Sequence, residues 1–107
     1  MAQPSLQDIL GPGATQDATT ITIVKADLPG LTPAANNNGE QIFAGVVRRA
    51  RVYLTEANQE TNPDQNITFG ETFSSFVSRN NQTYRQNQVP VNFQKLDAEP
   101  DIEPDEY

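Results

Sequence analysis

Apolar residues in this chain gather in four short segments separated by long polar stretches, which limits the core that it can build. The segments cover residues 19–28, 40–57, 67–79 and 83–96, and only 36% of the 107 residues are hydrophobic. A compact chain of this length buries roughly two-thirds of the surface that its unfolded state exposes, and the polar stretches lower that share here. We therefore expect one small domain whose stability gains from a partner subunit.

Residues 19–28 carry the clearest strand pattern. β-branched side chains dominate this segment, and Pro29-Gly30 ends it. Apolar side chains occupy both faces of the expected strand, so we expect burial on two sides.

The segment 40–57 fits two periodicities. A helix would place these side chains on one face, with Val52 as the exception: Ile42, Phe43, Val46, Val47, Ala50, Tyr53, Leu54 and Ala57. A strand would also have one apolar face, with Arg48 as the exception. Gly45 and the β-branched residues lower helix propensity by up to about 1 kcal/mol each, and the neighbouring segments are β-like. We therefore favour a strand and keep a helix as the alternative.

The last two apolar segments form a hairpin in this interpretation. Gly70 interrupts the first strand, where it would suit a bulge. Asn80-Asn81 provides a two-residue turn because Asn tolerates positive φ, and Pro90 places part of the return strand on a sheet edge. The order of elements predicts an all-β or β-rich body, a small antiparallel meander or sandwich.

Two extended arms flank this body. Residues 1–18 form an N-terminal arm in which Ser5 and Asp8 resemble a capping box before a very short helix that Gly11 ends. Residues 19–96 form the β-rich body. Residues 97–107 alternate acids with proline and form an acidic, extended tail with too few apolar groups to fold alone.

The residue types that are missing exclude most catalytic chemistry. The chain has no Cys, His or Trp, so disulfides, thiolate nucleophiles, Cys/His zinc sites and the usual general base are unavailable. No phosphate-binding loop, nucleophile elbow or metal-ligand spacing is present. Acid pairs such as Asp27 with Glu71 or Glu60 with Asp64 do not differ from ordinary loop acids. We expect no enzymatic activity, no cofactor and no metal.

The charge distribution argues against nucleic acid as a partner. The net charge is −7, and the residues up to position 96 carry seven basic and eight acidic side chains, while six carboxylates lie in the tail. A nearly neutral body with an acidic tail lacks the basic face that phosphate backbones require. The N-terminal residues resemble neither a signal peptide nor a membrane span. We expect cytoplasmic synthesis, no signal-peptide secretion and no membrane insertion.

Two groups of residues are candidate protein interfaces. Arg48, Arg49 and Arg51 form the only basic cluster, and arginine holds carboxylates in a bidentate manner, for example those of another copy's tail. The alternative is a solvated face. The tail side chains are the second group: Asp97, Glu99, Asp101, Ile102, Glu103, Asp105, Glu106 and Tyr107. The tail is either a docking arm for a neighbour or a solubilising end, and it lacks the spacing of a calcium-binding loop.

This organisation, with the arm MAQPSLQDIL, the body from Thr19 to Leu96 and the end DAEPDIEPDEY, resembles small structural proteins of tailed phages and contractile injection systems. These are tail, baseplate, neck or capsid-decorating subunits. The resemblance implies a repeated, non-catalytic subunit, homo-oligomeric within a virion or tail-like particle, whose arms interlock with copies of itself or with other particle components. The alternative function is a free-standing polar β-sheet module that binds protein or carbohydrate.

Overall fold

The computed structural model describes residues 3–95, 101, 102 and 104–107, and these residues form a mixed α/β fold. In chain order the elements are α1 (Leu6–Leu10), β1 (Thr15–Gln16), β2 (Ile21–Thr22), the 3-10 helix η1 (Lys25–Asp27), α2 (Gly39–Tyr53), α3 (Glu56–Thr61), β3 (Ile67–Phe69), β4 (Phe73–Arg79), β5 (Gln82–Gln88), β6 (Val91–Phe93) and the 3-10 helix η2 (Pro104–Glu106). Helix accounts for 32% and strand for 24%. The prediction of an all-β body is therefore wrong, whereas the antiparallel strand pairing is confirmed.

The segment expected as a long strand is the central helix α2, so our choice between the two periodicities was wrong. A capping box starts this helix. The Asn38 side chain accepts a hydrogen bond from the Gln41 backbone N–H at 2.8 Å, and Gln41 Oε1 accepts one from Asn38 N at 3.0 Å. Val52, the exception on the helical wheel, is indeed exposed. The cap and the 3.6-residue period together outweigh the weak propensity of Gly45 and the β-branched residues.

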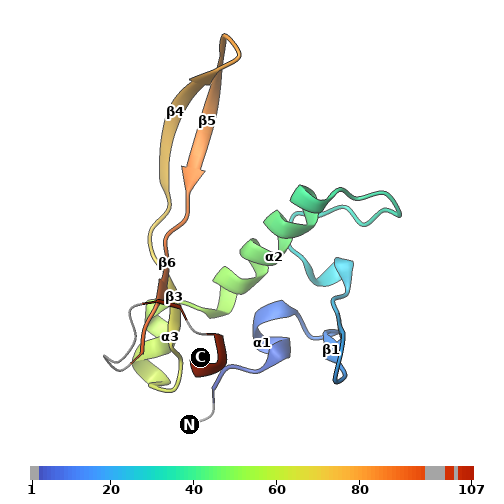
Figure 1. Ribbon diagram of the computed structural model, residues 1–107, viewed down its shortest axis with the longest axis vertical. Coiled ribbons are helices and arrows are strands. Elements are labelled where there is room, and N and C mark those ends of the chain that lie inside the picture. Colours follow the sequence, from blue (N-terminus) through green and yellow to red (C-terminus); the bar gives the residue numbers. More distant parts are fainter. Residues whose placement is uncertain (1–2, 96–100, 103) are drawn as a thin grey trace.

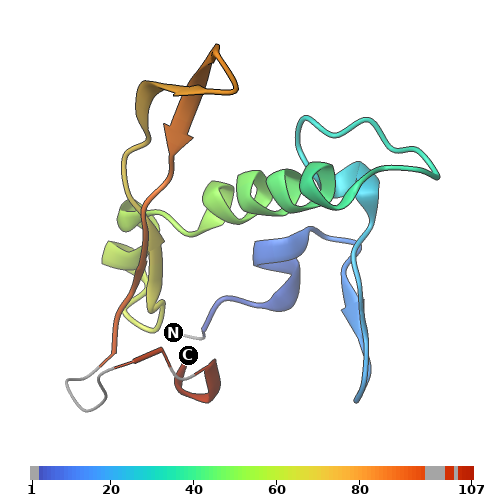
Figure 2. The ribbon, with the colours of Figure 1, turned by 45° about the horizontal axis from the view of Figure 1, so that its top comes forward.

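The N-terminal arm has the short helix that was predicted. The Ser5 and Asp8 side chains complete a capping box around the start of α1, with both hydrogen bonds at 3.0 Å. Gly11 ends the helix with φ of +111°, a conformation that favours glycine. A helix of five residues is unstable alone, and α1 packs alongside α2, as Figures 1 and 2 show.

Residues 19–28 do not form the single strand that the sequence pattern predicted, so that prediction is wrong. Only Ile21–Thr22 pairs, with Thr15–Gln16, and the chain then turns into η1. The Asp27 carboxylate accepts a hydrogen bond from Gly13 N at 2.8 Å, which ties the end of η1 to the arm. Burial on two sides is also absent, because Ile21 is 57% exposed.

The second half of the chain is a long antiparallel ribbon. β3 pairs with β6 and β4 with β5, and the turn at Asn80-Asn81 has φ of 51° and 60°, as the hairpin prediction requires. Gly70 lies in the break between the two ladders, where its N–H donates to the Pro90 carbonyl at 3.0 Å. Among the described residues every sheet has two strands, so neither a broad meander nor a sandwich forms.

The hydrophobic core that this chain builds by itself is small, as the polar composition predicted. Its buried apolar side chains are Ala14, Leu28, Ala50 and Leu54. Next to it, Gln65 is 1% exposed, and its Nε2 donates to the carbonyls of Thr55 and Ile67. The chain is extended rather than compact: its radius of gyration is 16.1 Å, against about 13 Å for a compact domain of this length. Figures 1 and 2 show why, since the β4–β5 hairpin stands away from the remaining elements.

Candidate functional site

The β4–β5 hairpin, residues 73–88, is exposed along almost its whole length. Every residue of its two strands is exposed except Val77 and Tyr84, which are half-buried. Phe73 is 60% and Phe76 66% exposed. An isolated two-stranded hairpin is marginally stable in water, and large exposed aromatic side chains are typical of contact surfaces.

Each face of the hairpin combines an aromatic ring with an arginine. The register places Phe73, Val77 and Tyr84 on one face and Phe76 with Arg85 on the other. The Arg85 guanidinium lies 4.8 Å from the centre of the Phe76 ring, and its Nη1 donates to Ser74 Oγ at 2.8 Å.

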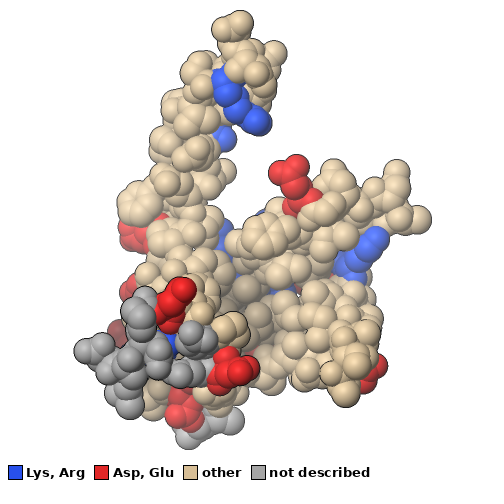
Figure 3. All heavy atoms as spheres, viewed as in Figure 1, with Lys and Arg blue, Asp and Glu red and all other residues tan. Residues whose placement is uncertain are grey.

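The second arginine, Arg79, covers the Tyr84 ring at 4.2 Å on the first face. Residues 73–88 contain no Asp or Glu. The hairpin therefore presents a basic surface with aromatic groups, which Figure 3 shows as the blue atoms near its tip.

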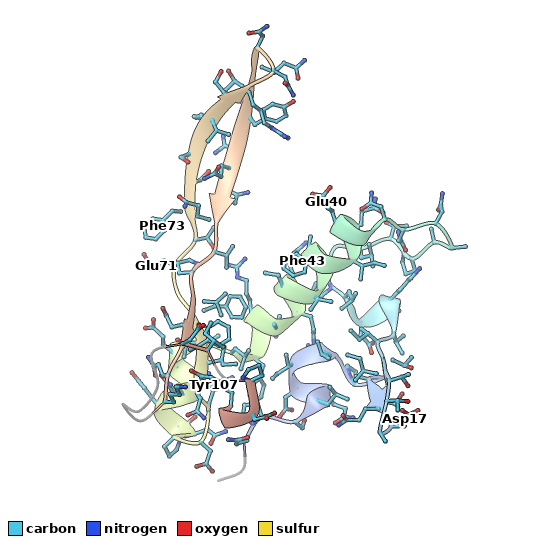
Figure 4. The ribbon with its side chains drawn as sticks, in the orientation of Figure 1. Asp17, Glu40, Phe43, Glu71, Phe73 and Tyr107 are labelled. Atoms are coloured by element: carbon cyan, nitrogen blue, oxygen red, sulfur yellow. The ribbon has the colours of Figure 1, made fainter. Side chains whose placement is uncertain are left out.

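The helix α2 carries a second exposed apolar surface. Phe43 is 69% exposed, although the helical pattern placed it on the buried face. Figure 4 shows Phe43 and the neighbouring Glu40 on the side of α2 from which the hairpin rises. We call the face of α2 that Phe43 and Val47 share, one turn apart, the Phe43 surface. Val52 is also exposed, at 61%, but it lies nine residues along the helix and hence on the opposite side.

The total exposed surface is larger than that of a compact chain of this mass. Its accessible surface is 7873 Å², whereas a compact monomer of the same mass exposes about 5,900 Å². The excess is about 2,000 Å², which is comparable to the total surface buried in a stable protein interface.

The three arginines predicted to form one cluster point to different parts of the fold. Arg49 Nη2 donates to the carbonyls of Gln7 and Asp8, at 3.3 and 3.4 Å, and joins α1 to α2. Arg51 Nη2 donates to Thr72 Oγ1 at 2.9 Å and joins α2 to the base of the hairpin. Around a helix Arg49 lies 100° from Arg48 and 160° from Arg51, which explains why Arg49 faces another element. Arg48 and Arg51 are 60° apart and differ in the part of the fold that each reaches.

Arg48 lies over Gly30 and lines a pocket of about 340 Å³ between the first half of α2 and the loop after Leu28. We call it the Arg48 pocket. Gly30 has φ of +81°, and its missing side chain leaves the space that the guanidinium occupies.

The part of the tail that the structure describes folds back on the body. The Tyr107 ring meets Phe93 edge to face, with centroids 5.7 Å apart, and Lys95 Nζ donates to the Asp101 carbonyl at 3.1 Å. Ile102 is 51% exposed and Asp105 is exposed. Four of the predicted tail contacts, Asp97, Glu99, Glu103 and the side chain of Glu106, lie outside the described part.

Asp17 has the one pKa shift resolved among the described residues. The backbone N–H groups of Thr19 and Thr20 each donate to its carboxylate at 2.8 Å, and these bonds hold the pKa of Asp17 below its ordinary value. The residue closes the fully exposed turn between β1 and β2, so the shift belongs to a turn motif and not to a pocket.

The described residues hold no group of three or more Asp, Glu, His or Cys placed to bind a metal ion. In the same residues, no helix combines the length and apolar character that crossing a bilayer requires.

Comparisons of this chain with protein-family models, with curated proteins and with solved structures found no match. The candidate site is therefore argued from its geometry. Sequence reasoning missed the Phe43 surface because a helical wheel shows which residues share a face and not whether that face is covered. The hairpin was predicted, but its projection from the body was not.

Proposed function

We propose that this protein is a non-catalytic structural subunit that assembles with copies of itself. The observation that carries this proposal is the excess of about 2,000 Å² of accessible surface over that of a compact monomer. A chain with four buried apolar side chains in its own described core gains stability when neighbours cover its exposed rings.

The two exposed apolar surfaces are complementary in charge. The β4–β5 hairpin carries Arg79 and Arg85 and no acid, whereas Glu40 borders the Phe43 surface and the chain as a whole is acidic. We therefore propose that the hairpin of one copy packs on the Phe43 surface of a second copy. Complementary charges favour this orientation over contacts between two hairpins, which would bring like charges together.

Such a contact joins two different surfaces and is heterologous. Every copy in a row would offer one free hairpin and one free Phe43 surface, so the contact generates a ring or an open filament. This geometry fits a repeated subunit. With the resemblance of the chain's organisation to small proteins of tailed phages and contractile injection systems, we propose a phage-like or tail-like particle as its setting. The neighbours would be its own copies and other particle components.

The experiment compares the association of three full-length proteins by sedimentation velocity. In the test variant, Phe73→Ser and Phe76→Ser remove the two exposed rings of the hairpin. In the control, Ile21→Ser removes an equally exposed apolar side chain from β2, outside both surfaces. We expect the test variant to remain monomeric at concentrations where the original and control proteins associate.

Circular dichroism of each variant verifies that the helical fold is retained. If the double variant associates as the original does, the hairpin is not the contact and the proposal fails. If the original protein, the test variant and the control all stay monomeric, the result favours the alternative of a free-standing binding module.

A further inference from the structure

The Arg48 pocket has the charge of an anion-binding site. Arg48 is the one charged residue among those lining it, and no carboxylate lines it. Among the described residues Arg48 makes no hydrogen bond or ion pair, in contrast to Arg49 and Arg51. Its exposed guanidinium lies over Gly30 and donates to no other described residue.

Of the two side-chain amides that line the pocket, one keeps a free donor. Gln41 Oε1 already accepts hydrogen bonds from Asn37 Nδ2 at 3.3 Å and from Asn38 N at 3.0 Å. Asn37 Oδ1 accepts one from Ala34 N at 2.8 Å. These bonds set the orientation of both side-chain amides, and Gln41 Nε2 has no partner among the described residues.

The pocket has more room than one carboxylate needs. Gly30 and Gly45 contribute wall without side chains, and the volume of about 340 Å³ exceeds that of a single carboxylate. An unpaired guanidinium with a neighbouring amide donor matches the two oxygens of a carboxylate, which arginine binds in a bidentate manner.

We propose that the Arg48 pocket binds a carboxylate side chain of an acidic peptide segment. The segment that we assign to the pocket is residues 97–107 of a second copy, which hold six carboxylates in eleven positions. The proposal goes beyond the hairpin contact, because the pocket lies on the loop side of α2 and its lining includes neither a hairpin residue nor Phe43 or Val47.

The test uses a fluorescein-labelled peptide with the sequence DAEPDIEPDEY and a second peptide in which Asn and Gln replace every acid. Fluorescence anisotropy is measured against full-length protein at low salt. We expect Arg48→Gln to weaken binding of the acidic peptide about tenfold, because it removes the charge and the forked donors. Arg48→Lys keeps the charge but loses the fork, so its affinity should lie between the two.

The matched control is Arg51→Gln, which makes the same charge change on α2 outside the pocket lining, and it should change affinity less than twofold. The neutral peptide should bind at least tenfold more weakly than the acidic one. Equal losses for Arg48→Gln and Arg51→Gln would reduce the effect to net charge and overturn the site. Equal binding of the acidic and neutral peptides would also overturn the site, and so would no binding of either peptide.

Sedimentation of Arg48→Gln identifies the source of the carboxylate. Weaker self-association in this variant assigns it to the tail of a second copy, and unchanged association with intact wild-type peptide binding assigns it to another acidic protein. The Phe73→Ser, Phe76→Ser variant separates the two proposals, since it should lose association and keep the peptide affinity.

Discussion

Replacing Phe43 by alanine removes the largest exposed apolar side chain of α2. A phenylalanine offers about 200 Å² of accessible surface, and 69% exposure leaves about 140 Å² of it uncovered in the isolated chain. Covering this area on docking contributes about 3.5 kcal/mol at 25 cal/mol per Å². Alanine retains a small part of this apolar area. We therefore expect the variant to weaken association by about 3 kcal/mol, or about 150-fold in Kd.

The same substitution should not destabilise the dissociated chain. Alanine favours a helix more than phenylalanine does, and little of the Phe43 ring is buried, so the thermal unfolding midpoint in dilute solution should stay level or rise. Sedimentation equilibrium gives the Kd, and circular dichroism gives the midpoint. Val52→Ala is the matched control, because Val52 is 61% exposed on the opposite side of α2 and should leave the Kd unchanged.

Two results would refute this reasoning about Phe43. An unchanged Kd would mean that its ring lies outside the contact between copies. A lowered unfolding midpoint in the dissociated chain would mean that the ring belongs to the chain's own core.

Two further predictions concern local motifs. Asn38→Ala removes the side-chain acceptor that caps α2 at Gln41 N and should cost about 1 kcal/mol. That loss should lower the thermal midpoint by about 4–8 °C, and no change would mean that the cap adds nothing. Asp17 has a folded-state pKa below its ordinary value because Thr19 and Thr20 donate to it. Its contribution to stability is therefore present above the unfolded-state pKa and lost as pH falls through the folded-state pKa. Carbon-detected NMR titration should place the Asp17 midpoint below the model-peptide value, and a midpoint at or above that value would contradict the turn geometry.

Local signals in the sequence predicted local structure well. Ser5, Asp8 and Gly11 marked the first helix, and Asn80-Asn81 marked the hairpin turn, because each depends on backbone hydrogen bonds or on positive φ within a few residues. The capping box at Asn38 and Gln41 was equally local and would have identified α2 as a helix.

Longer-range features could not be predicted in the same way. The chain after β2 is tied to the arm by Asp27, which accepts a hydrogen bond from Gly13, fourteen residues earlier. The separation of Arg49 from Arg51 depends on α2 being a helix, because a strand would place both on one face. The projection of Phe73 and Phe76 depends on what the rest of the chain leaves uncovered. The small size of the chain's own hydrophobic core was predictable because it follows from composition alone.

The mass of the native protein in solution tests the central claim most directly. Sedimentation velocity and light scattering over a range of concentrations would measure it. Our account predicts a concentration-dependent species whose mass is a multiple of the 11.8 kDa chain, in a ring or a growing series. A single species of 11.8 kDa up to millimolar concentration would contradict it, because the exposed rings of the hairpin and of α2 would then have no partner in a second copy.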